Sequence, residues 1–346
     1  MNCTGMVQFA GPYLILIGDI EDRSYAKTGI GIVQWQRDLV AGQVRFSGNS
    51  LDLGVPDLSV AEAASRGVRS MFIGVAPIGG AIPNSWLGTI EEAALAGLDI
   101  VCGLHKRLTD YAGVVDAARK SGARLVDVRI PPKNLVVGTG RRRSGKRVLM
   151  VGTDCAVGKK YSALALNRAM RSAGLRSTFR ATGQTGIMIA GAGIPIDAVV
   201  ADFVSGAAEM ISPDNDDDHW DVIEGQGSLF HPGYAGVSLG LLHGSQPDAI
   251  VVCHEANRQE ILGWPGFSVP SIPECIERSL LEGSLTNPNI QCRGVCINTS
   301  ALSRPQRATY LEAIAKETGL PCVDPLVGGC ASIVENLVDN IPESQG

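Results

Sequence analysis

The sequence predicts an α/β protein with two domains, each built on a parallel β-sheet. Short apolar segments alternate with helical patterns along most of the 346 residues, as they do in βαβ units. The 42 glycines cluster after apolar segments, where the ligand-binding loops of such sheets lie. One apolar segment, residues 148–151, runs into a loop bounded by Gly152 and Gly158 and followed by Lys159, which is the pattern of a phosphate-binding P-loop. We therefore expect a Rossmann-like sheet followed by a P-loop NTPase-like sheet.

Residues 1–135 are predicted to form the Rossmann-like domain. Its expected strands are residues 14–17, 70–75, 100–102 and 124–128, and its expected helices lie near residues 87–96 and 111–121. No G-x-G-x-x-G pattern follows a strand there, so only the βαβ architecture would support the prediction of a dinucleotide site. Residues 27–31 fit either a small anion-binding loop or a turn, and His105 is expected to be structural.

A polar, basic and glycine-containing segment from Pro131 to Lys146 is the expected domain boundary. Residues 136–346 then form the P-loop domain. Its expected strands are residues 148–151, 177–181, 221–224, 249–253, 294–298 and 320–323, with helices near 159–172 and 197–210 and glycine-rich loops at 182–186 and 190–193.

Composition limits the class of protein. The formal net charge of −5 argues against a general nucleic-acid binder, and no apolar run approaches the roughly 20 residues of a membrane span. The chain start lacks the pattern of a signal peptide. The nine cysteines are scattered and read as reduced thiols. We expect a cytoplasmic homo-oligomer that acts on a small molecule, without nucleic acid or membrane partners.

The P-loop carries the most specific signal in the chain. Glycines at both ends permit backbone angles that a side chain opposes, so successive N–H groups can point at an anion in front of a helix N-terminus. A nucleotide hydrolase also needs a Ser or Thr after the lysine to bind Mg²⁺, and this chain has Lys160 there. The loop therefore predicts a phosphate site without a metal. Its expected members are Gly152, Thr153, Asp154, Cys155, Ala156, Val157, Gly158, Lys159 and Lys160.

Polar side chains follow three strands of the second domain and are expected to meet beside this loop. Glu224 ends an apolar strand, where burial would raise its pKa and make it a proton acceptor, although a Glu that caps a neighbouring helix fits too. His231 is a second candidate base or a donor that orients ligand. The expected ligand-binding residues at the first two strand ends are Arg180, Gln184, Thr185, Gln226 and Ser228, and the third strand ends at His254 and Glu255.

Cys155 lies inside the P-loop, near a helix N-terminus that is expected to lower its pKa. It is either a nucleophile or a small packing residue. No partner His stands near it in the sequence, which favours packing.

Five segments together resemble one family. They are residues 152–159, 182–186, 189–195, 224–228 and 253–256. The resemblance is to a former domain-of-unknown-function family, with a Rossmann-like N-terminal and a P-loop C-terminal domain, whose characterised branch is the D-glutamate N-acetyltransferases of the DgcN type. It covers nearly the whole chain and implies acetyl-CoA as the donor. The loop and the segments at 224–228 and 320–325 are also similar to dethiobiotin synthetase, a Mg-ATP ligase.

The resemblance implies transfer of an acetyl group from acetyl-CoA to the amino group of a D-amino acid, with D-glutamate as the expected acceptor. Under this hypothesis Glu224 or His231 accepts the proton of the amine, and Arg180 pairs with a carboxylate of the acceptor. The alternative is a Mg-ATP-dependent kinase or ligase of the dethiobiotin-synthetase type, which Lys160 disfavours. A third hypothesis, from another class, is a nucleotide-sensing module without catalysis.

Overall fold

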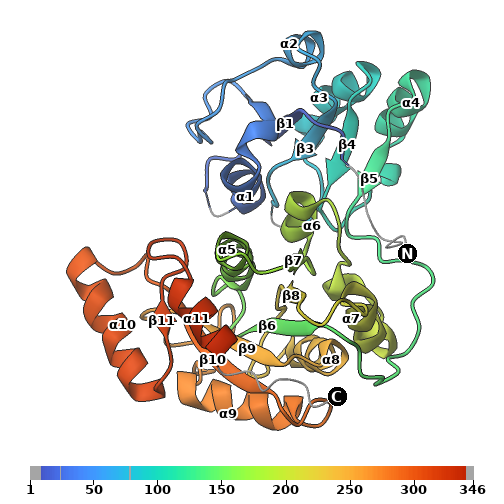
Figure 1. The fold of residues 1–346 in the computed structure, drawn as a ribbon. Helices are drawn as coiled ribbons and strands as arrows, with labels where there is room; N and C mark the ends of the chain where they lie inside the picture. The colour runs from blue at the N-terminus through green and yellow to red at the C-terminus, as the bar shows by residue number, and fades with distance from the viewer. Residues whose placement is uncertain (1–8, 24, 78, 340–346) are drawn as a thin grey trace. The chain divides into compact units, whose positions relative to one another are not determined.

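The computed structural model describes residues 9–23, 25–77 and 79–339. The chain divides into two compact units (Figure 1). The first comprises the chain up to Pro131 together with Gln184–Pro195, and the second comprises Pro132–Gly183 and the chain from Ile196 onward. The sequence held no signal that residues 184–195 pack with the first unit. No helix in the described ranges is long and apolar enough to cross a membrane.

The first unit is built on a five-stranded sheet of order β2-β1-β3-β4-β5. Every pairing between these strands is parallel, as predicted. The side chains of β1 are almost completely excluded from solvent, so this strand forms the centre of the core. The strand bounds are β1 Tyr13–Gly18, β2 Val40–Arg45, β3 Ser70–Ile73, β4 Asp99–Cys102 and β5 Leu125–Asp127.

The helices of the first unit include one that the sequence analysis interpreted wrongly. Residues 27–31 are neither an anion-binding loop nor a turn, because they begin helix α1. Helix α2 begins with a capping box between Ser59 and Glu62, and α4 ends at Gly122 with φ +80°, as helix signals predict. The helix bounds are α1 Lys27–Trp35, α2 Val60–Ser65, α3 Asn84–Leu95 and α4 Ala112–Ser121.

Helix α6, Gln184–Ala190, replaces the glycine-rich loop that was predicted at residues 182–186. Five of its seven residues are buried, which explains why a glycine-containing segment is helical here. The helix packs against α1, where the hydroxyls of Thr28 and Thr185 lie 2.8 Å apart. The side chain of Gln36 donates a hydrogen bond to the carbonyl of Ile189 at 2.7 Å. These contacts hold the segment in the first unit.

The second unit is built on a six-stranded parallel sheet of order β11-β10-β9-β6-β8-β7. Strand β6 lies between β8 and β9, so its carboxyl end has a strand end on each side. The register pairs Gly152 with Cys253 and Leu149 with Ile223. The strand bounds are β6 Lys146–Gly152, β7 Ser177–Arg180, β8 Trp220–Ile223, β9 Ala249–Glu255, β10 Gln291–Asn298 and β11 Cys322–Val323.

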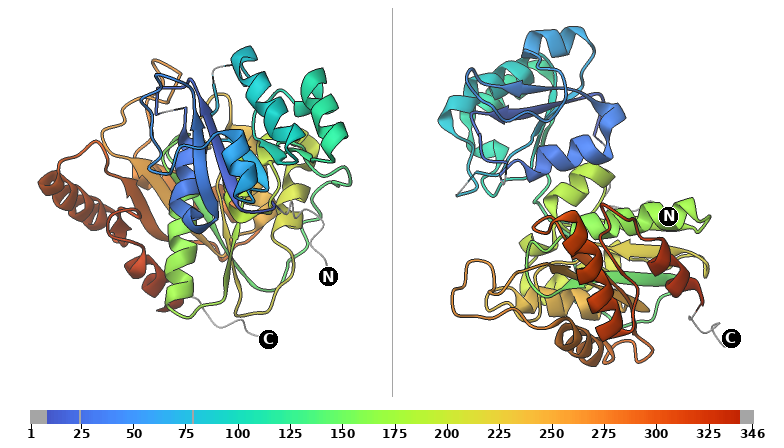
Figure 2. Two further views of the ribbon diagram at one scale, coloured as in Figure 1. Left: turned by 90° about the horizontal axis from the view of Figure 1, so that it is seen from above. Right: turned by 90° about the vertical axis from the view of Figure 1, so that its left-hand side faces the viewer.

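Helices lie against this sheet (Figure 2), and α5 follows directly from the loop after β6. The helix predicted at residues 197–210 was wrong in its first half, because Val200 is extended with ψ 136°. Two short 3-10 turns occupy that region, and the α-helix starts only at Val204. The helix bounds are α5 Lys159–Ser172, α7 Val204–Ile211, α8 Ala235–Ser245, α9 Ile272–Gly283, α10 Arg304–Thr318 and α11 Ala331–Asp339.

Candidate functional site

The loop between β6 and α5 is a tight turn that two glycines make feasible for different reasons. Gly158 has φ +106°, a conformation that side chains oppose, as predicted. Gly152 differs from the prediction, because its role is close packing. A Cβ there would lie 3.0 Å from Val157 Cγ2 and 3.2 Å from the carbonyl oxygen of Cys253. Ala156 adopts a left-handed φ of +56° without being glycine, and such strain is typical of ligand-binding loops.

Lys159, the first residue of α5, is buried. Its Nζ donates a hydrogen bond to the carbonyl of Asp154 at 2.7 Å, so the ammonium group lies across the loop. Burial lowers its pKa, because a desolvated ammonium is less stable than a hydrated one. An anion bound in the loop would supply a negative charge to pair with this buried ammonium. Next to it, Lys160 Nζ lies 4.2 Å from the ring centroid of Tyr161. In the sequence, Lys160 stands at the position of the Ser or Thr that binds Mg²⁺ in other P-loops.

Arg258 and His254 fix the start of the loop, and the sequence had indicated only His254 as a polar residue at a strand end. Arg258 Nη1 donates to the carboxylate of Asp154 at 2.7 Å, although the two residues are 104 positions apart. Arg258 also forms an ion pair with Glu255. The hydroxyl of Thr153 lies 2.9 Å from Nδ1 of His254. Burial, followed by the charge of Arg258, lowers the pKa of His254 to about 4, so this ring is neutral at pH 7.

Glu224 lies directly after β8 and is buried. Its Oε2 accepts hydrogen bonds from the backbone N–H groups of Thr182 at 2.9 Å and Gly183 at 3.1 Å. Burial raises the pKa of the carboxyl, while these two bonds and the charge of Lys160 oppose the rise. Gln226 joins the same network, because its Nε2 donates to the hydroxyl of Thr182 at 2.9 Å. A buried carboxyl with a raised pKa can accept a proton.

Arg180, which was expected to capture a carboxylate of the acceptor, has a carboxylate partner within the protein. Its Nε donates to Asp221 Oδ1 at 2.7 Å, and the two side chains form an ion pair. The side chain of Asp221 is only 2% exposed. Burial raises the pKa of Asp221, and the guanidinium offsets part of that cost. Leaving the carboxylate of Asp221 buried and unpaired would be expensive. The structure therefore gives Arg180 an internal partner.

The other predicted ligand-binding residues lie in different places. Ser228 is buried, and its Oγ accepts a hydrogen bond from the N–H of Phe230 at 3.2 Å. Thr185 is bonded to Thr28 inside the first unit. Gln184, the first residue of α6, lines a cavity of the first unit. The structure therefore brings Glu224, Gln226 and the loop together within the second unit and places Gln184 and Thr185 in the first.

His231 is 1% exposed, and three contacts fix its ring. The ring stacks on Tyr234 with centroids 4.4 Å apart and meets the ring of Trp264 edge-on at 4.5 Å. Its Nδ1 accepts a hydrogen bond from the N–H of Gly233 at 3.1 Å. Because an N–H can only donate, the neutral ring carries its own proton on Nε2. That Nε2 is buried and has no hydrogen-bond partner among the described residues.

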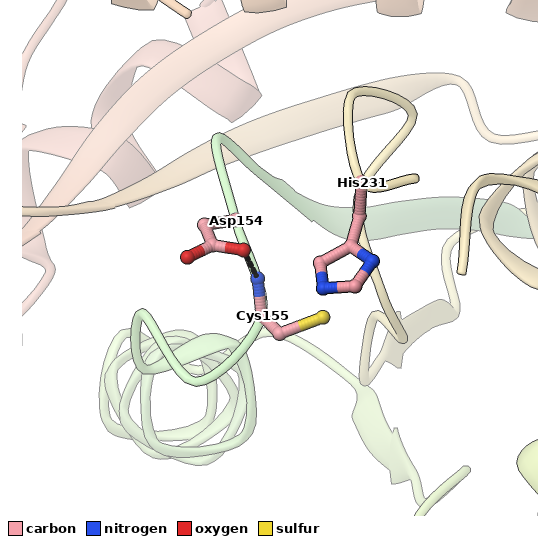
Figure 3. A group of neighbouring side chains, drawn as sticks. All are labelled: Asp154, Cys155 and His231. Atoms are coloured by element: carbon pink, nitrogen blue, oxygen red, sulfur yellow. Dashed lines mark hydrogen bonds between the residues drawn. The ribbon is translucent and has the colours of Figure 1, made fainter. Parts of the chain in front are cut away.

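Asp154, Cys155 and His231 lie together, with one potential ligand atom from each within 4.8 Å of the others (Figure 3). Carboxylate, thiolate and imidazole are zinc ligands, and the hydrogen bonds that these side chains already make decide whether a metal fits. Asp154 Oδ2 already accepts from Arg258 and from the N–H of Leu262. A metal on Nε2 would require a proton on Nδ1, which faces the N–H of Gly233. The existing bonds of Asp154 and His231 therefore oppose a metal at this cluster.

Cys155 differs from the prediction in one respect. Its pKa is raised, mainly by burial, whereas the helix N-terminus was expected to lower it. Burial outweighs the favourable charge of Lys159, so the thiol is the resting form. The partner His that the sequence did not reveal is His231, which is 76 positions away and faces the sulfur (Figure 3).

Fold and site together define a two-unit α/β protein whose P-loop lies at the carboxyl end of β6, between the ends of β8 and β9. The chain belongs to the DUF1611 family. The family's P-loop domain, described as a domain of unknown function, matches residues 135–334, and its Rossmann-like N-terminal domain matches residues 44–131.

Similar proteins cover the chain almost from end to end. A D-glutamate N-acetyltransferase of a Pseudoalteromonas species is 46% identical over 96% of this chain and 100% of its own length. One from Tritonibacter scottomollicae is 44% identical over 94% and 98%. The crystal structure of a DUF1611 family protein from Anabaena variabilis is 32% identical with a TM-score of 0.85, covering 96% of this chain and 100% of that one.

Proposed function

We propose that this protein is an N-acetyltransferase that moves the acetyl group of acetyl-CoA to the amino group of D-glutamate. The observation that carries the proposal is the 46% identity, over 96% of this chain, to a protein named D-glutamate N-acetyltransferase. The site supports it with an anion-binding loop for the donor and a buried carboxyl for proton transfer.

The donor's phosphates are proposed to bind at residues 152–160. The loop offers backbone N–H groups at the start of α5 and the buried ammonium of Lys159, which together suit phosphate oxygens. Lys160 stands where a magnesium-binding hydroxyl would be needed for Mg-ATP. A phosphate-bearing donor that needs no metal, such as acetyl-CoA, fits this loop better than Mg-ATP does.

The reaction needs one proton acceptor. The ammonium group of the acceptor must lose a proton before its nitrogen attacks the thioester carbonyl, and the CoA thiolate then leaves and takes up a proton. We propose Glu224 as the base, because its raised pKa suits this role. The pantetheine arm of CoA separates its phosphates from its thioester. Glu224 beside the loop can therefore serve as the base only if the donor folds back onto the loop.

We also infer a cytoplasmic location, which the eight described cysteines support because all are free thiols. Assembly into a homo-oligomer stays a prediction, with size-exclusion chromatography coupled to light scattering as its test.

Incubation of the purified protein with acetyl-CoA and D-glutamate tests the proposed function. We expect release of free CoA thiol and formation of N-acetylglutamate, detected by mass spectrometry, with L-glutamate as the matched acceptor control. A parallel reaction with ATP and Mg²⁺ tests the kinase or ligase alternative. Turnover of ATP without acetyl transfer would overturn the proposal. Binding of either donor without turnover would favour a sensor.

A further inference from the structure

The first unit contains a cavity of about 440 Å³ at the carboxyl ends of β3 and β4. The loops that follow these two strands form most of its wall, and Arg129 and Gln184 complete it. In parallel α/β sheets, ligands bind beside the carboxyl ends of the strands, close to the point where the strand order reverses. In this sheet the order reverses between β1 and β3. The cavity also falls within the size range of small-molecule sites.

The polar side chains of the cavity suit an anion. Arg129, His105 and Gln184 line it, and no acidic residue is among its described lining. The Nε of Arg129 donates to the carbonyl of Gly103 at 2.8 Å, which orients the guanidinium plane at the wall. Arginine and amide donors in fixed positions are the usual means of carboxylate recognition.

Two close backbone approaches show that this wall is tightly built. A Cβ on Gly80 would lie 2.6 Å from Cδ2 of His105, and a Cβ on Gly103 would lie 3.1 Å from Cβ of Gln184. Glycine at these two positions lets the histidine ring and helix α6 reach the cavity. Gln184 belongs to the P-loop half of the sequence, but its segment packs in the first unit and Gln184 lines this cavity.

A dicarboxylic acceptor needs a cation, and the guanidinium of Arg129 lines this cavity. We propose that the cavity of the first unit binds the carboxylates of the acceptor amino acid, with Arg129, Gln184 and His105 as its polar contacts. This inference rests on the proposed acetyl transfer and assigns the carboxylates of the acceptor to the Rossmann-like unit. His105, which the sequence analysis took as structural, then contacts ligand.

Arg129→Gln and Gln184→Ala test the assignment, with Lys106→Gln as the matched control. Lys106 is the exposed neighbour of His105, and its Nζ lies 4.7 Å from the ring centroid of Tyr111, outside the cavity lining. Loss of a charge-assisted bond should raise the KM for D-glutamate roughly 10- to 100-fold in Arg129→Gln. The KM for acetyl-CoA should stay within about twofold, which also shows that the variant is folded. Arg129→Lys should recover only part of the affinity, because it keeps the charge and loses the planar fork.

Calorimetric titration of D-glutamate into the protein saturated with CoA provides a readout without turnover. We expect weakened binding in Arg129→Gln and Gln184→Ala and unchanged binding in Lys106→Gln. If the wild type acetylates D-glutamate and both cavity variants bind it normally, the cavity assignment is wrong and the proposed function stands. If the wild type neither binds D-glutamate nor transfers acetyl groups to it, the proposed function itself fails.

Discussion

The carboxylate of Glu224 and the backbone N–H of Gly183 lie 3.1 Å apart, at the residue that directly precedes α6. The same oxygen also holds the N–H of Thr182. A carboxyl with a pKa raised by burial thus holds the backbone of the two residues that precede α6. Glu224 could thus act as a base or hold the two residues before α6 in place, and both roles stay predictions. Substitutions can separate the two roles.

Glu224→Gln should lower kcat by roughly 10²–10⁴-fold if Glu224 is the base, because the amide keeps its shape and cannot accept a proton. Acetyl-CoA binding should stay nearly intact. Steady-state kinetics over a range of both substrates provide the measurement. Near-normal turnover would leave Glu224 a purely structural role.

The pH dependence gives a second check on Glu224. The base acts when ionised, so kcat/KM should fall as pH drops through its raised pKa. The contribution of Glu224 to folding stability should change with pH in the opposite direction to kcat/KM. A carboxyl whose pKa is raised in the folded state contributes stability that is present below its unfolded pKa and is lost as pH rises through its folded pKa. Glu224→Gln should therefore melt no lower than wild type at pH 8, whereas Glu224→Ala, which loses both backbone bonds, should melt lower.

Lys159→Ala should raise the KM for acetyl-CoA at least tenfold and change the KM for the acceptor little. The buried ammonium lies across the loop, and charge-assisted bonds to phosphate are among the stronger polar contacts. Lys316→Ala, in the last turn of α10, is the control for loss of one positive charge. An unchanged KM for acetyl-CoA in Lys159→Ala would remove the loop from donor binding.

Acetyl transfer should persist in excess EDTA. Lys160 occupies the position of the metal-binding hydroxyl, and the hydrogen bonds of Asp154 and His231 oppose a metal in the nearby cluster. Activity is measured before and after chelation, and then after separate additions of Mg²⁺ and Zn²⁺. Loss of acetyl-transfer activity in EDTA, with recovery after addition of Zn²⁺, would assign a metal to Asp154, Cys155 and His231. Rescue by Mg²⁺ together with ATP turnover would favour the ligase.

Gly225→Ala should destabilise the fold by about 3 kcal/mol or more, because overpacking against rigid backbone is costly. A Cβ there would lie 1.6 Å from the carbonyl oxygen of Met150 in β6. Gly236→Ala is the matched control, since a Cβ in that part of α8 meets nothing within 4 Å, and alanine should stabilise the helix by roughly 0.5–1 kcal/mol. Urea unfolding of the three proteins measures both effects. Equal stability of Gly225→Ala and wild type would contradict the described approach of residue 225 to β6.

The sequence predicted the parts of the fold that are determined by residues close together in the sequence. The order of strand, loop and helix around Lys159 was evident, because apolar runs, glycines and the lysine occur within about 25 residues. The predicted bounds of α5 were correct. Helix α6 was missed, because its glycines favour a loop locally and only its burial against α1 makes it helical.

The site was less predictable, because its contacts also join residues that lie far apart in the sequence. Arg180 with Asp221, Arg258 with Asp154, and His231 with Cys155 are pairs brought together by the sheet. No local pattern encodes such pairs. The sequence could nominate Arg180 for a carboxylate, but it could not show that the protein supplies that carboxylate itself. The pKa of Cys155 was predicted in the wrong direction, because burial cannot be read from the loop's own residues.

The last prediction concerns the buried ring of His231, whose Nδ1 accepts from Gly233 and whose Nε2 has no partner among the described residues. This arrangement makes the neutral ring a donor at Nε2, so it should donate a hydrogen bond to a ligand atom at the loop. His231→Ala should raise the KM for acetyl-CoA roughly tenfold. His231→Gln, which keeps an N–H donor, should lose less, and both variants should keep the wild-type shape of the pH–rate profile. His243→Gln in α8, whose ring bonds the carbonyl of Glu282, is the control. Nitrogen-15 NMR of the wild type should show a protonated Nε2 and an unprotonated Nδ1. The opposite tautomer, with a large loss of kcat in both His231 variants, would make His231 the base instead of Glu224.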